Sequence, residues 1–131
     1  MDAGSLENIL DVYRIAQVIP QIDEKIIAKI AIQLLCGISF LHSLKLLHRD
    51  IKPANILLNT KGEVKLTDFG ISKELINDID FSTTFVGTTS YMSPERIMGQ
   101  SYSFKSDIWS LGLVLYELAT GKKLYSNKSP I

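Results

Sequence analysis

The sequence predicts a single, mainly α-helical domain with a small β-hairpin. Its 131 residues are 46% hydrophobic, which is enough for one hydrophobic core and too little for two. Apolar residues recur at helical spacing in two long segments, 26–41 and 107–120. Between these segments, two short apolar runs flank a turn that contains Gly62, the pattern of a hairpin.

The N-terminal residues 1–12 predict a loop followed by the start of a helix. Ser5 has the side-chain hydroxyl of a good N-cap and precedes Leu6, Ile9 and Leu10, which are spaced for one helix face. A helix is therefore expected to begin directly after Ser5.

A second helix is expected after Pro20 and Asp23. Its stripe is Ile26, Ile27, Ile30, Leu34, Leu35, Ile38 and Leu41. Such a stripe is typical of a core helix. Because Cys36 lies in this apolar run, we expect a buried packing residue rather than a reactive thiol. We interpret His42 as a helix-end residue rather than a ligand.

The hairpin is expected from the apolar run 56–58, a turn at 60–63 and the apolar residues Val64 and Leu66. Polar residues flank it, with Asn55 before the first strand and Asp68 after the second. We expect the hairpin to hold these two residues at opposite ends of a rigid pair of strands.

The C-terminal part predicts a short helix from Pro94, a loop at 100–104 and a long apolar helix from Asp107. Gly121 is a natural stop for that helix. We interpret 108–119 as the most apolar run of the chain; it contains Ser110 and Glu117 and is shorter than the ~20 residues of a membrane span.

Charge and composition exclude several classes of protein. Fourteen basic and fourteen acidic residues give a formal charge of zero, so binding to nucleic acid or to a membrane surface by bulk electrostatics is not expected. The single Cys36 cannot form an internal disulfide, and the first twenty residues lack a signal-peptide pattern. We expect a soluble, cytoplasmic protein.

The sequence LLHRDIKPAN, residues 46–55, carries the strongest functional signal. It reads HRDxKxxN, the spacing of a phosphoryl-transfer loop. A lone HRD would fit a solvated charged loop equally well. Here Asp68-Phe69-Gly70 follows, and then Thr88 and Ser93-Pro94-Glu95 in the order of a GT and an APE-like motif. The ordered motifs make coincidence a poor explanation.

On these motifs the chain resembles the eukaryotic protein kinases, in particular the large, C-terminal lobe of their α+β fold. Within them it is most similar to the MAP kinase kinases, on the residues FVGTTSYMSPERI (85–97) and SDIWSLGLVLYELATGK (106–122). The resemblance implies that residues 1–131 are a partial kinase domain, with the hinge and the large lobe up to the long central helix. No GxGxxG and no VAIK-like lysine precede Leu46, so the N-terminal lobe is expected to be absent. A complete kinase domain needs roughly twice this length, near the ~250-residue upper range of domains.

The resemblance implies a role for each motif residue. Asp50 would accept the proton of the attacking hydroxyl, and Lys52 would neutralise charge on the phosphoryl group. Asn55 would take part in catalysis by binding a metal ion. Asn55 and Asp68 would hold Mg²⁺, and ATP would also contact Met1, Asp2, Ser5, Lys52, Leu57 and Asp68. Structural roles are implied for His48, Arg49, Phe69, Gly70, Thr88, Glu95 and Asp107.

For Leu57, Asp107 and Glu95 the residues themselves add to what the resemblance implies. Leu57, expected beneath adenine, is on sequence alone a buried leucine. Asp107 is expected to be buried and to accept hydrogen bonds from the catalytic-loop backbone, since a buried carboxylate needs donors. Glu95 would pair with an arginine of a later helix in the family, and we expect it to be solvated or unpaired here.

The stretch between the DFG and SPE motifs contains the candidate regulatory phosphorylation sites Ser82, Thr83 and Thr84. The alternative is an ordinary solvated loop. A phosphate there would add close to two negative charges and could pair with Arg49. The family carries two phosphorylatable residues four apart before FVGT, whereas this chain has Asp80 and Thr84 at that spacing. A smaller departure is Thr67, where the family often has cysteine.

Two functions remain open on the sequence. The first is a serine/threonine kinase, dual-specificity by resemblance, that uses ATP and Mg²⁺, acts on a MAP kinase and is activated by an upstream kinase. The second is a truncated, inactive kinase remnant that acts as a binding or scaffold module. The intact HRDxKxxN motif favours the kinase function for the product of the gene. The missing lobe predicts that the isolated 131-residue chain is inactive.

Overall fold

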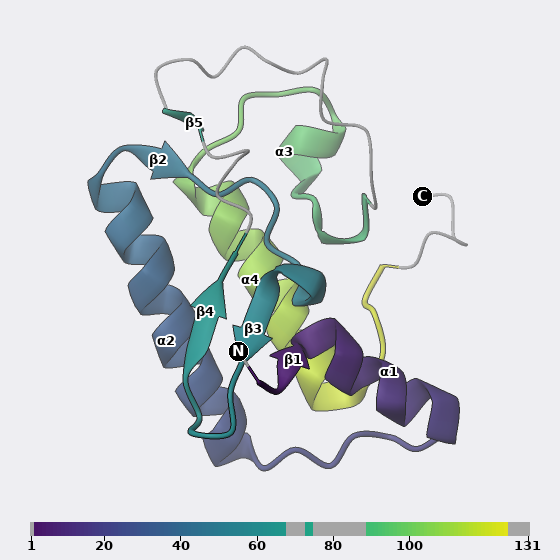
Figure 1. The fold of residues 1–131 in the computed structure, drawn as a ribbon. Coiled ribbons are helices and arrows are strands. Elements are labelled where there is room, and N and C mark those ends of the chain that lie inside the picture. The colour runs from purple at the N-terminus through teal and green to yellow at the C-terminus, as the bar shows by residue number, and fades with distance from the viewer. Residues whose placement is uncertain (1, 68–72, 75–88, 126–131) are drawn as a thin grey trace.

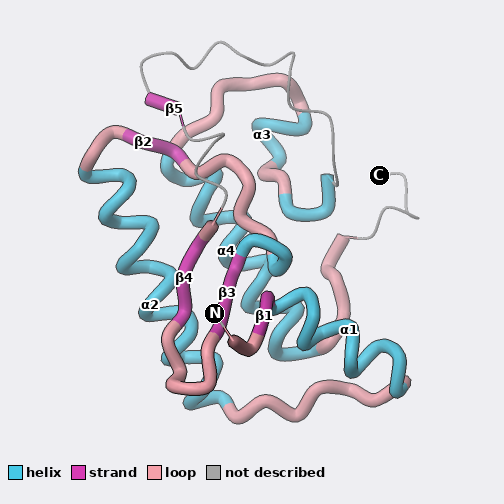
Figure 2. Tube along the Cα trace, viewed as in Figure 1, coloured by secondary structure: helices cyan, strands magenta, loops and turns pink. Residues whose placement is uncertain are grey.

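The computed structural model describes residues 2–67, 73–74 and 89–125 of the chain (Figure 1). Its helices are α1 (Leu6–Ala16), α2 (Glu24–Ser43), α3 (Pro94–Ile97) and α4 (Phe104–Thr120). Two short 3-10 helices, η1 (Pro53–Asn55) and η4 (Thr89–Tyr91), complete the helical part. Figure 2 shows that helices and loops dominate the described chain and that the strands are short. The predicted mainly helical domain with a small hairpin is confirmed.

The strands form two small antiparallel sheets. The larger sheet has the order β1-β3-β4, from Gly4–Ser5, Ile56–Leu58 and Val64–Leu66. The smaller sheet pairs β2 (Leu46–Leu47) with β5 (Lys73–Glu74). In the larger sheet Ser5 lies opposite Leu57, which joins the N-terminus to the predicted hairpin.

The register of the hairpin corrects one prediction. Ile56 lies opposite Leu66, so the start of β3 and the end of β4 meet at the same end of the hairpin. The backbone N–H of Thr67 donates a hydrogen bond to the carbonyl of Asn55 at 2.8 Å. An antiparallel pair returns the chain to its starting point, so the expectation of opposite ends does not hold for Asn55 and Thr67, while Asp68 itself lies outside the described residues.

The helix ends follow local chemistry. Ser5 caps α1, as predicted, and forms a capping box with Asn8; Asp23 caps α2. Gly121 ends α4 with a positive φ of 76°, and a Cβ there would lie 2.3 Å from Cδ of Pro20, so glycine is required by the close approach as well as by the conformation. The start of α4 was predicted too late, because Ser103 forms a second capping box and the helix begins at Phe104.

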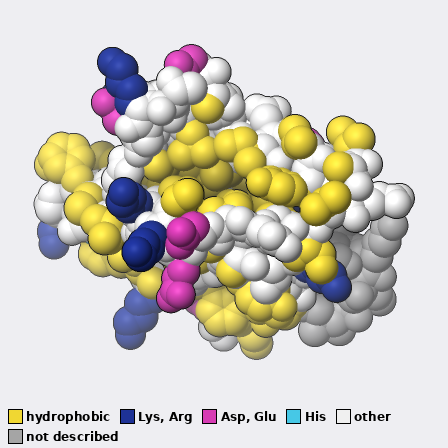
Figure 3. Space-filling view, turned by 90° about the horizontal axis from the view of Figure 1, so that it is seen from below, with side chains coloured by type: hydrophobic (Ala, Val, Ile, Leu, Met, Phe, Trp, Pro, Cys, Tyr) yellow, Lys and Arg dark blue, Asp and Glu magenta, His cyan; other side chains and the backbone are white. Residues whose placement is uncertain are grey.

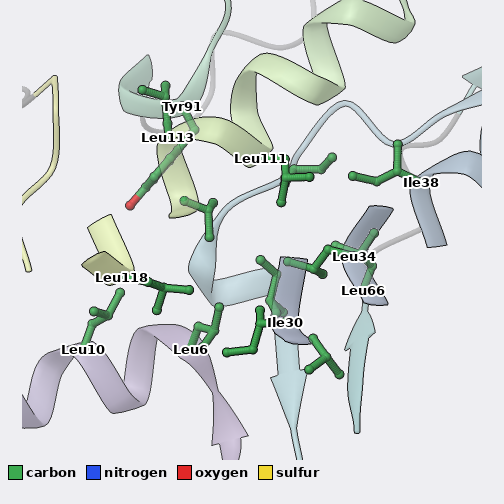
Figure 4. Packing of buried hydrophobic residues seen from close by; sticks show 14 residues of the cluster. Leu6, Leu10, Ile30, Leu34, Ile38, Leu66, Tyr91, Leu111, Leu113 and Leu118 are labelled. Carbon is green, nitrogen blue, oxygen red and sulfur yellow. The ribbon is translucent and has the colours of Figure 1, made fainter. Parts of the chain in front are cut away.

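The core lies where α2 and α4 pack on each other and on the hairpin (Figure 1). Figure 4 shows Leu6 and Leu10 of α1 facing Leu118 near the end of α4, with Leu34 of α2 beside Leu66 of β4. The buried cluster comprises Leu6, Leu10, Ile30, Leu34, Ile38, Ile51, Ile56, Val64, Leu66, Tyr91, Leu111, Leu113, Val114 and Leu118. This one cluster draws its residues from α1, α2, β3, β4, η4 and α4 and from Ile51 of the loop before η1.

The stripe of α2 is narrower than predicted. Only Ile30, Leu34, Ile38 and Leu41 of this helix are buried. Cys36 is exposed, so the prediction of a buried thiol was wrong. Cys36 follows Leu34 by two residues, so its side chain points away from the helix face that carries Ile30, Leu34 and Ile38.

Several large apolar side chains lie on the surface. Phe40 is 65% exposed and Ile32 is 62% exposed. On the side of the 17–23 linker, hydrophobic side chains gather around a hollow (Figure 3). By length and composition alone, α2 passes the criterion for a membrane-crossing helix, with a mean hydropathy of 1.7, a criterion that core helices also meet.

Candidate active site

The loop that carries HRDxKxxN runs from β2 through η1 into β3. His48 is fully buried, and Arg49 is 6% exposed. Arg49 adopts a φ of +73°, a left-handed conformation that is unusual for a residue with a side chain. The surrounding hydrogen bonds must hold this conformation in place.

The carboxylate of Asp107 supplies most of those hydrogen bonds. It is fully buried at the start of α4 and accepts from the backbone N–H groups of His48 and Arg49, both at 3.0 Å. Tyr102 donates its hydroxyl to the same carboxylate at 2.5 Å, and Nε2 of His42 lies 2.9 Å away. A buried carboxylate with this many donors is well compensated. Asp107 thus takes the position that the resemblance implies, and His42, expected to be a plain helix-end residue, is one of its partners.

The Asp50 carboxylate is oriented by Asn55. The Asn55 amide nitrogen Nδ2 donates to the backbone carbonyl of Asp50 at 2.8 Å and to its Oδ2 at 3.0 Å. The Lys52 ammonium lies 3.7 Å from the same Oδ2. The side chains of Asp50 and Lys52 are 36% and 30% exposed, so both are open to a bound molecule. This arrangement can accept a proton and place a positive charge beside it.

His48 links this loop to the end of the hairpin. The backbone N–H of Asp50 donates to Nδ1 of His48 at 3.1 Å. Because Nδ1 accepts, the proton of a neutral ring sits on Nε2, which lies 2.6 Å from the carbonyl oxygen of Thr67 and donates to it. The residue that precedes the DFG motif is therefore fixed against the loop that carries Asp50.

A magnesium site is only partly visible in the described residues. Among them, no group of three or more His, Cys, Asp and Glu side chains could hold a metal ion. Both hydrogen bonds of the Asn55 amide to Asp50 use Nδ2, and its oxygen Oδ1 takes no part in them. Oxygen ligands are those that Mg²⁺ prefers, so Asn55 fits the predicted role, while its predicted partner Asp68 lies outside the described residues.

The residues near the N-terminus that were predicted to contact ATP differ in their surroundings. Ser5 lies beside Leu57, which is half-buried rather than fully buried. The Asp2 carboxylate, expected near a ribose, instead accepts hydrogen bonds from the backbone N–H and the hydroxyl of Thr60, both at 2.9 Å. These bonds, the backbone one foremost, hold the pKa of Asp2 below its usual 3.8.

Glu95 does not behave as predicted. Its carboxylate accepts a hydrogen bond from the hydroxyl of Ser106 at 2.6 Å. Partial burial opposes ionisation, but the bond from Ser106 and the backbone N–H of Glu95 itself leave its pKa below the usual value. The expectation of an unpaired or merely solvated glutamate was wrong, because the start of α4 brings a hydroxyl to it.

Other predictions fall outside the described residues. They concern Met1, Asp68, Phe69, Gly70, Ser82, Thr83, Thr84 and Thr88. An open cavity of about 180 Å³ lies at the ends of α1 and α4, lined by residues 13–14, 17–20 and 120–122, and it contains none of the predicted site residues.

Sequence reasoning missed two polar clusters. Near the catalytic loop, Nη1 of Arg96 donates to the backbone carbonyl of Arg49 at 2.6 Å. Elsewhere, the fully buried Glu117 accepts from the hydroxyl of Tyr91 and pairs with Arg14 of α1. An acid within the apolar run of α4 was a usable signal for the second cluster; nothing in the spacing pointed to Arg96.

Known proteins of one family resemble this chain over most of its length. The family model described as "Protein kinase domain" matches residues 1–130. Mitogen-activated protein kinase kinase 3 of Arabidopsis thaliana is 50% identical over 133 aligned positions, which cover 100% of this chain and 24% of the relative. A MAP kinase kinase of Saccharomyces cerevisiae is 58% identical over 102 positions, 78% of this chain and 20% of the relative.

A third relative, dual specificity mitogen-activated protein kinase kinase 1 of Dictyostelium discoideum, is 50% identical over 131 positions, 99% of this chain and 19% of its own length. The chain therefore spans about a fifth to a third of the length of the relatives that it matches.

Proposed function

Because this chain belongs to the protein kinase family, we propose that it is the catalytic-loop part of a MAP kinase kinase, which transfers the γ-phosphate of ATP to hydroxyl groups of a MAP kinase. The observation that carries the proposal is the set of contacts among Asp50, Lys52 and Asn55, held by the buried Asp107. The names of the relatives support the cascade, and they give no support to the inactive remnant.

In this proposal Asp50 orients the substrate hydroxyl and takes its proton. The hydroxyl oxygen attacks the γ-phosphorus, the bond to the β–γ bridging oxygen breaks, and ADP leaves. Lys52, beside Asp50, offsets negative charge on the transferring group. Mg²⁺, when bound, neutralises phosphate charge. Asn55 would ligate it through Oδ1 with Asp68 as the second ligand, so that Asn55 both binds the metal and fixes the direction of the Asp50 carboxylate.

We further propose that residues 1–131 are the hinge and large lobe of the kinase domain, without its N-terminal lobe. The β1-β3 pairing supports this, since it puts Ser5 and Leu57 side by side, where they would contact ribose and adenine. Asp2 is less suited to that role because Thr60 occupies its carboxylate. Met1 remains part of the proposal as a backbone contact to adenine.

Regulation and location complete the proposal. An upstream kinase would phosphorylate Ser82, Thr83 or Thr84, and the phosphate would pair with Arg49. The exposed, unpaired thiol of Cys36 is best kept in a reducing compartment. We therefore propose a cytoplasmic protein.

The test is Asp50→Asn in a complete kinase domain that carries this sequence. Loss of the proton acceptor should abolish phosphorylation of a MAP kinase while ATP binding, measured by titration calorimetry, is retained. Glu63→Gln, on the exposed hairpin turn, is the control for loss of one negative charge and should leave both measurements unchanged. Turnover by Asp50→Asn at the wild-type rate would refute the assigned role.

A further inference from the structure

The peptide bond between Arg49 and Asp50 is held at both of its polar groups. Its N–H belongs to Asp50 and donates to Nδ1 of His48 at 3.1 Å. Its carbonyl belongs to Arg49 and accepts from Nη1 of Arg96 at 2.6 Å. The first contact is local to the loop, whereas the second comes from α3, 47 residues further along the chain. The orientation of this peptide therefore depends on a residue outside the catalytic loop.

The backbone conformation of Arg49 makes the second contact important. Its φ of +73° lies in the left-handed region, which is unfavourable for a residue with a Cβ. Such a conformation persists only while the surrounding contacts hold it. The Asp107 carboxylate holds the N–H of Arg49 at 3.0 Å, and Arg96 holds its carbonyl. Loss of the bond from Arg96 would therefore favour rotation of the peptide toward a less strained geometry.

The guanidinium of Arg96 is itself held in place by an aromatic ring. Its Cζ lies 4.9 Å from the centroid of the Tyr102 ring, within the range of a cation–π contact. Tyr102 is 4% exposed, and its hydroxyl donates to the Asp107 carboxylate at 2.5 Å. The ring that fixes Arg96 is thus anchored to the same carboxylate that holds the N–H of Arg49.

We propose that Arg96 is a positioning residue for phosphoryl transfer, which acts through the carbonyl of Arg49 on the direction of the Asp50 carboxylate. A hydrogen bond from a guanidinium is charge-assisted and stronger than one between neutral groups. Rotation of the peptide between Arg49 and Asp50 would disturb the contact of the carboxylate with Asn55, whose Nδ2 lies 3.0 Å from Oδ2. Arg96 has this effect without touching ATP or the protein substrate.

The inference rests on the proposed function, because it assumes that Asp50 orients the attacking hydroxyl. A misplacement of about 1 Å at a catalytic group can lower a rate by about a hundredfold. A positioning residue should therefore change kcat and leave the KM for ATP unchanged. A role in stability alone would lower the melting temperature, and its effect on kcat would not depend on whether the substituted side chain can donate a hydrogen bond.

The test compares two unbranched substitutions in a complete kinase domain that carries this sequence. Arg96→Met keeps an aliphatic chain beside the Tyr102 ring but has no donor, whereas Arg96→Lys can donate to the carbonyl of Arg49. We expect kcat toward a MAP kinase to fall about tenfold or more in Arg96→Met, and Arg96→Lys to recover part of that loss. The KM for ATP should stay within about twofold of the wild type in both variants. Lys61→Met, on the exposed hairpin turn, is the control for loss of one positive charge and should leave kcat unchanged.

A second measurement requires neither ATP nor turnover. The amide proton of Asp50 is bonded to His48, so its exchange with solvent, followed by NMR, reports local rotation of this peptide. In Arg96→Met it should exchange about tenfold faster or more than in the wild type, with Arg96→Lys between the two. The amide of Leu34, in the buried face of α2, is the internal control. A loss of global stability would accelerate exchange at both positions.

The outcomes distinguish this inference from the proposed function. Wild-type kcat in Arg96→Met would overturn the positioning role, and so would equal kcat values of the Met and Lys variants at position 96. Equal acceleration of exchange at Asp50 and Leu34 would also overturn it. A wild-type domain that does not phosphorylate a MAP kinase would contradict the proposed function, and the exchange rate of Asp50 would still support or overturn the hold of Arg96 on the loop.

Discussion

The phenol of Tyr91 donates a hydrogen bond to the carboxylate of Glu117, which is completely buried near the C-terminal end of α4. Arg14 of α1 reaches the other oxygen of that carboxylate and also contacts Glu7 and Asp11. Burial and the bond to Glu117 raise the pKa of Tyr91 well above its usual range. This cluster joins α1, η4 and α4 at one charged group.

Tyr91→Phe should therefore destabilise the fold. It removes a donor from a buried charged acceptor, which typically costs about 1.5–3 kcal/mol. Urea unfolding followed by circular dichroism gives the free energy of unfolding. The control is Tyr116→Phe on α4, where the side chain is 41% exposed and the change should stay within about 0.5 kcal/mol. Equal effects of the two variants would contradict the importance of the buried bond.

Asp107→Ala should lower the free energy of unfolding by more than Tyr91→Phe does. It strips the backbone N–H groups of His48 and Arg49 of their acceptor, at about 1–3 kcal/mol for each buried donor. Asp107→Asn keeps one oxygen and should cost less. Unfolding free energies for the three proteins give the ranking, and an Asn variant no more stable than the Ala variant would mean that charge, not the acceptor atom, matters.

Asp2 should titrate below the usual 3.8, because Thr60 bonds only its ionised form through two donors. With the folded pKa lowered, its contribution to stability is present above pH 3.8 and is lost as the pH falls through the lower folded value. NMR titration of the side-chain carboxyl carbon measures the pKa. Thr60→Val, which keeps the backbone donor, should move it only part of the way back; a wild-type value at or above 3.8 would exclude the contact in solution.

The exposed apolar side chains of α2 should make the 131-residue chain prone to associate. Ile32→Glu replaces a side chain that is 62% exposed, so it should reduce concentration-dependent light scattering with a stability change of about 0.5 kcal/mol or less. Leu34→Ala, two residues along and 1% exposed, should cost about 2–5 kcal/mol and leave the surface unchanged. Similar scattering from wild type and Ile32→Glu would argue against this surface as the cause.

Local signals in the sequence were reliable guides to this fold. The cap at Ser5, the stop at Gly121 and the hairpin around Gly62 all depend on nearby residues, and these three were predicted. The start of α4 was missed because two serines, Ser103 and Ser106, form a capping box without an acidic residue.

Contacts between distant segments were predicted only where a motif named them. Asp107 was expected to meet the catalytic loop, and it does. The contact of Arg96 with Arg49 and that of Tyr91 with Glu117 depend on how α3 and α4 pack against other elements, which residue spacing does not encode. The prediction that Cys36 is buried was wrong for a related reason. An apolar stripe in a sequence identifies the middle of the buried helix face, but it does not define where that face ends.

The convergence on Asp107 also bears on the order in which the chain folds. Its carboxylate oxygens close loops of 58 and 59 residues to the backbone of Arg49 and His48, and we expect such closure to become favourable only once α2 and α4 are packed against each other. The loop with Asp50 is thus a late product of folding. Exchange of the amide protons of His48 and Arg49 with solvent would then require opening of the whole core, so a partly folded chain would have helices but no assembled site.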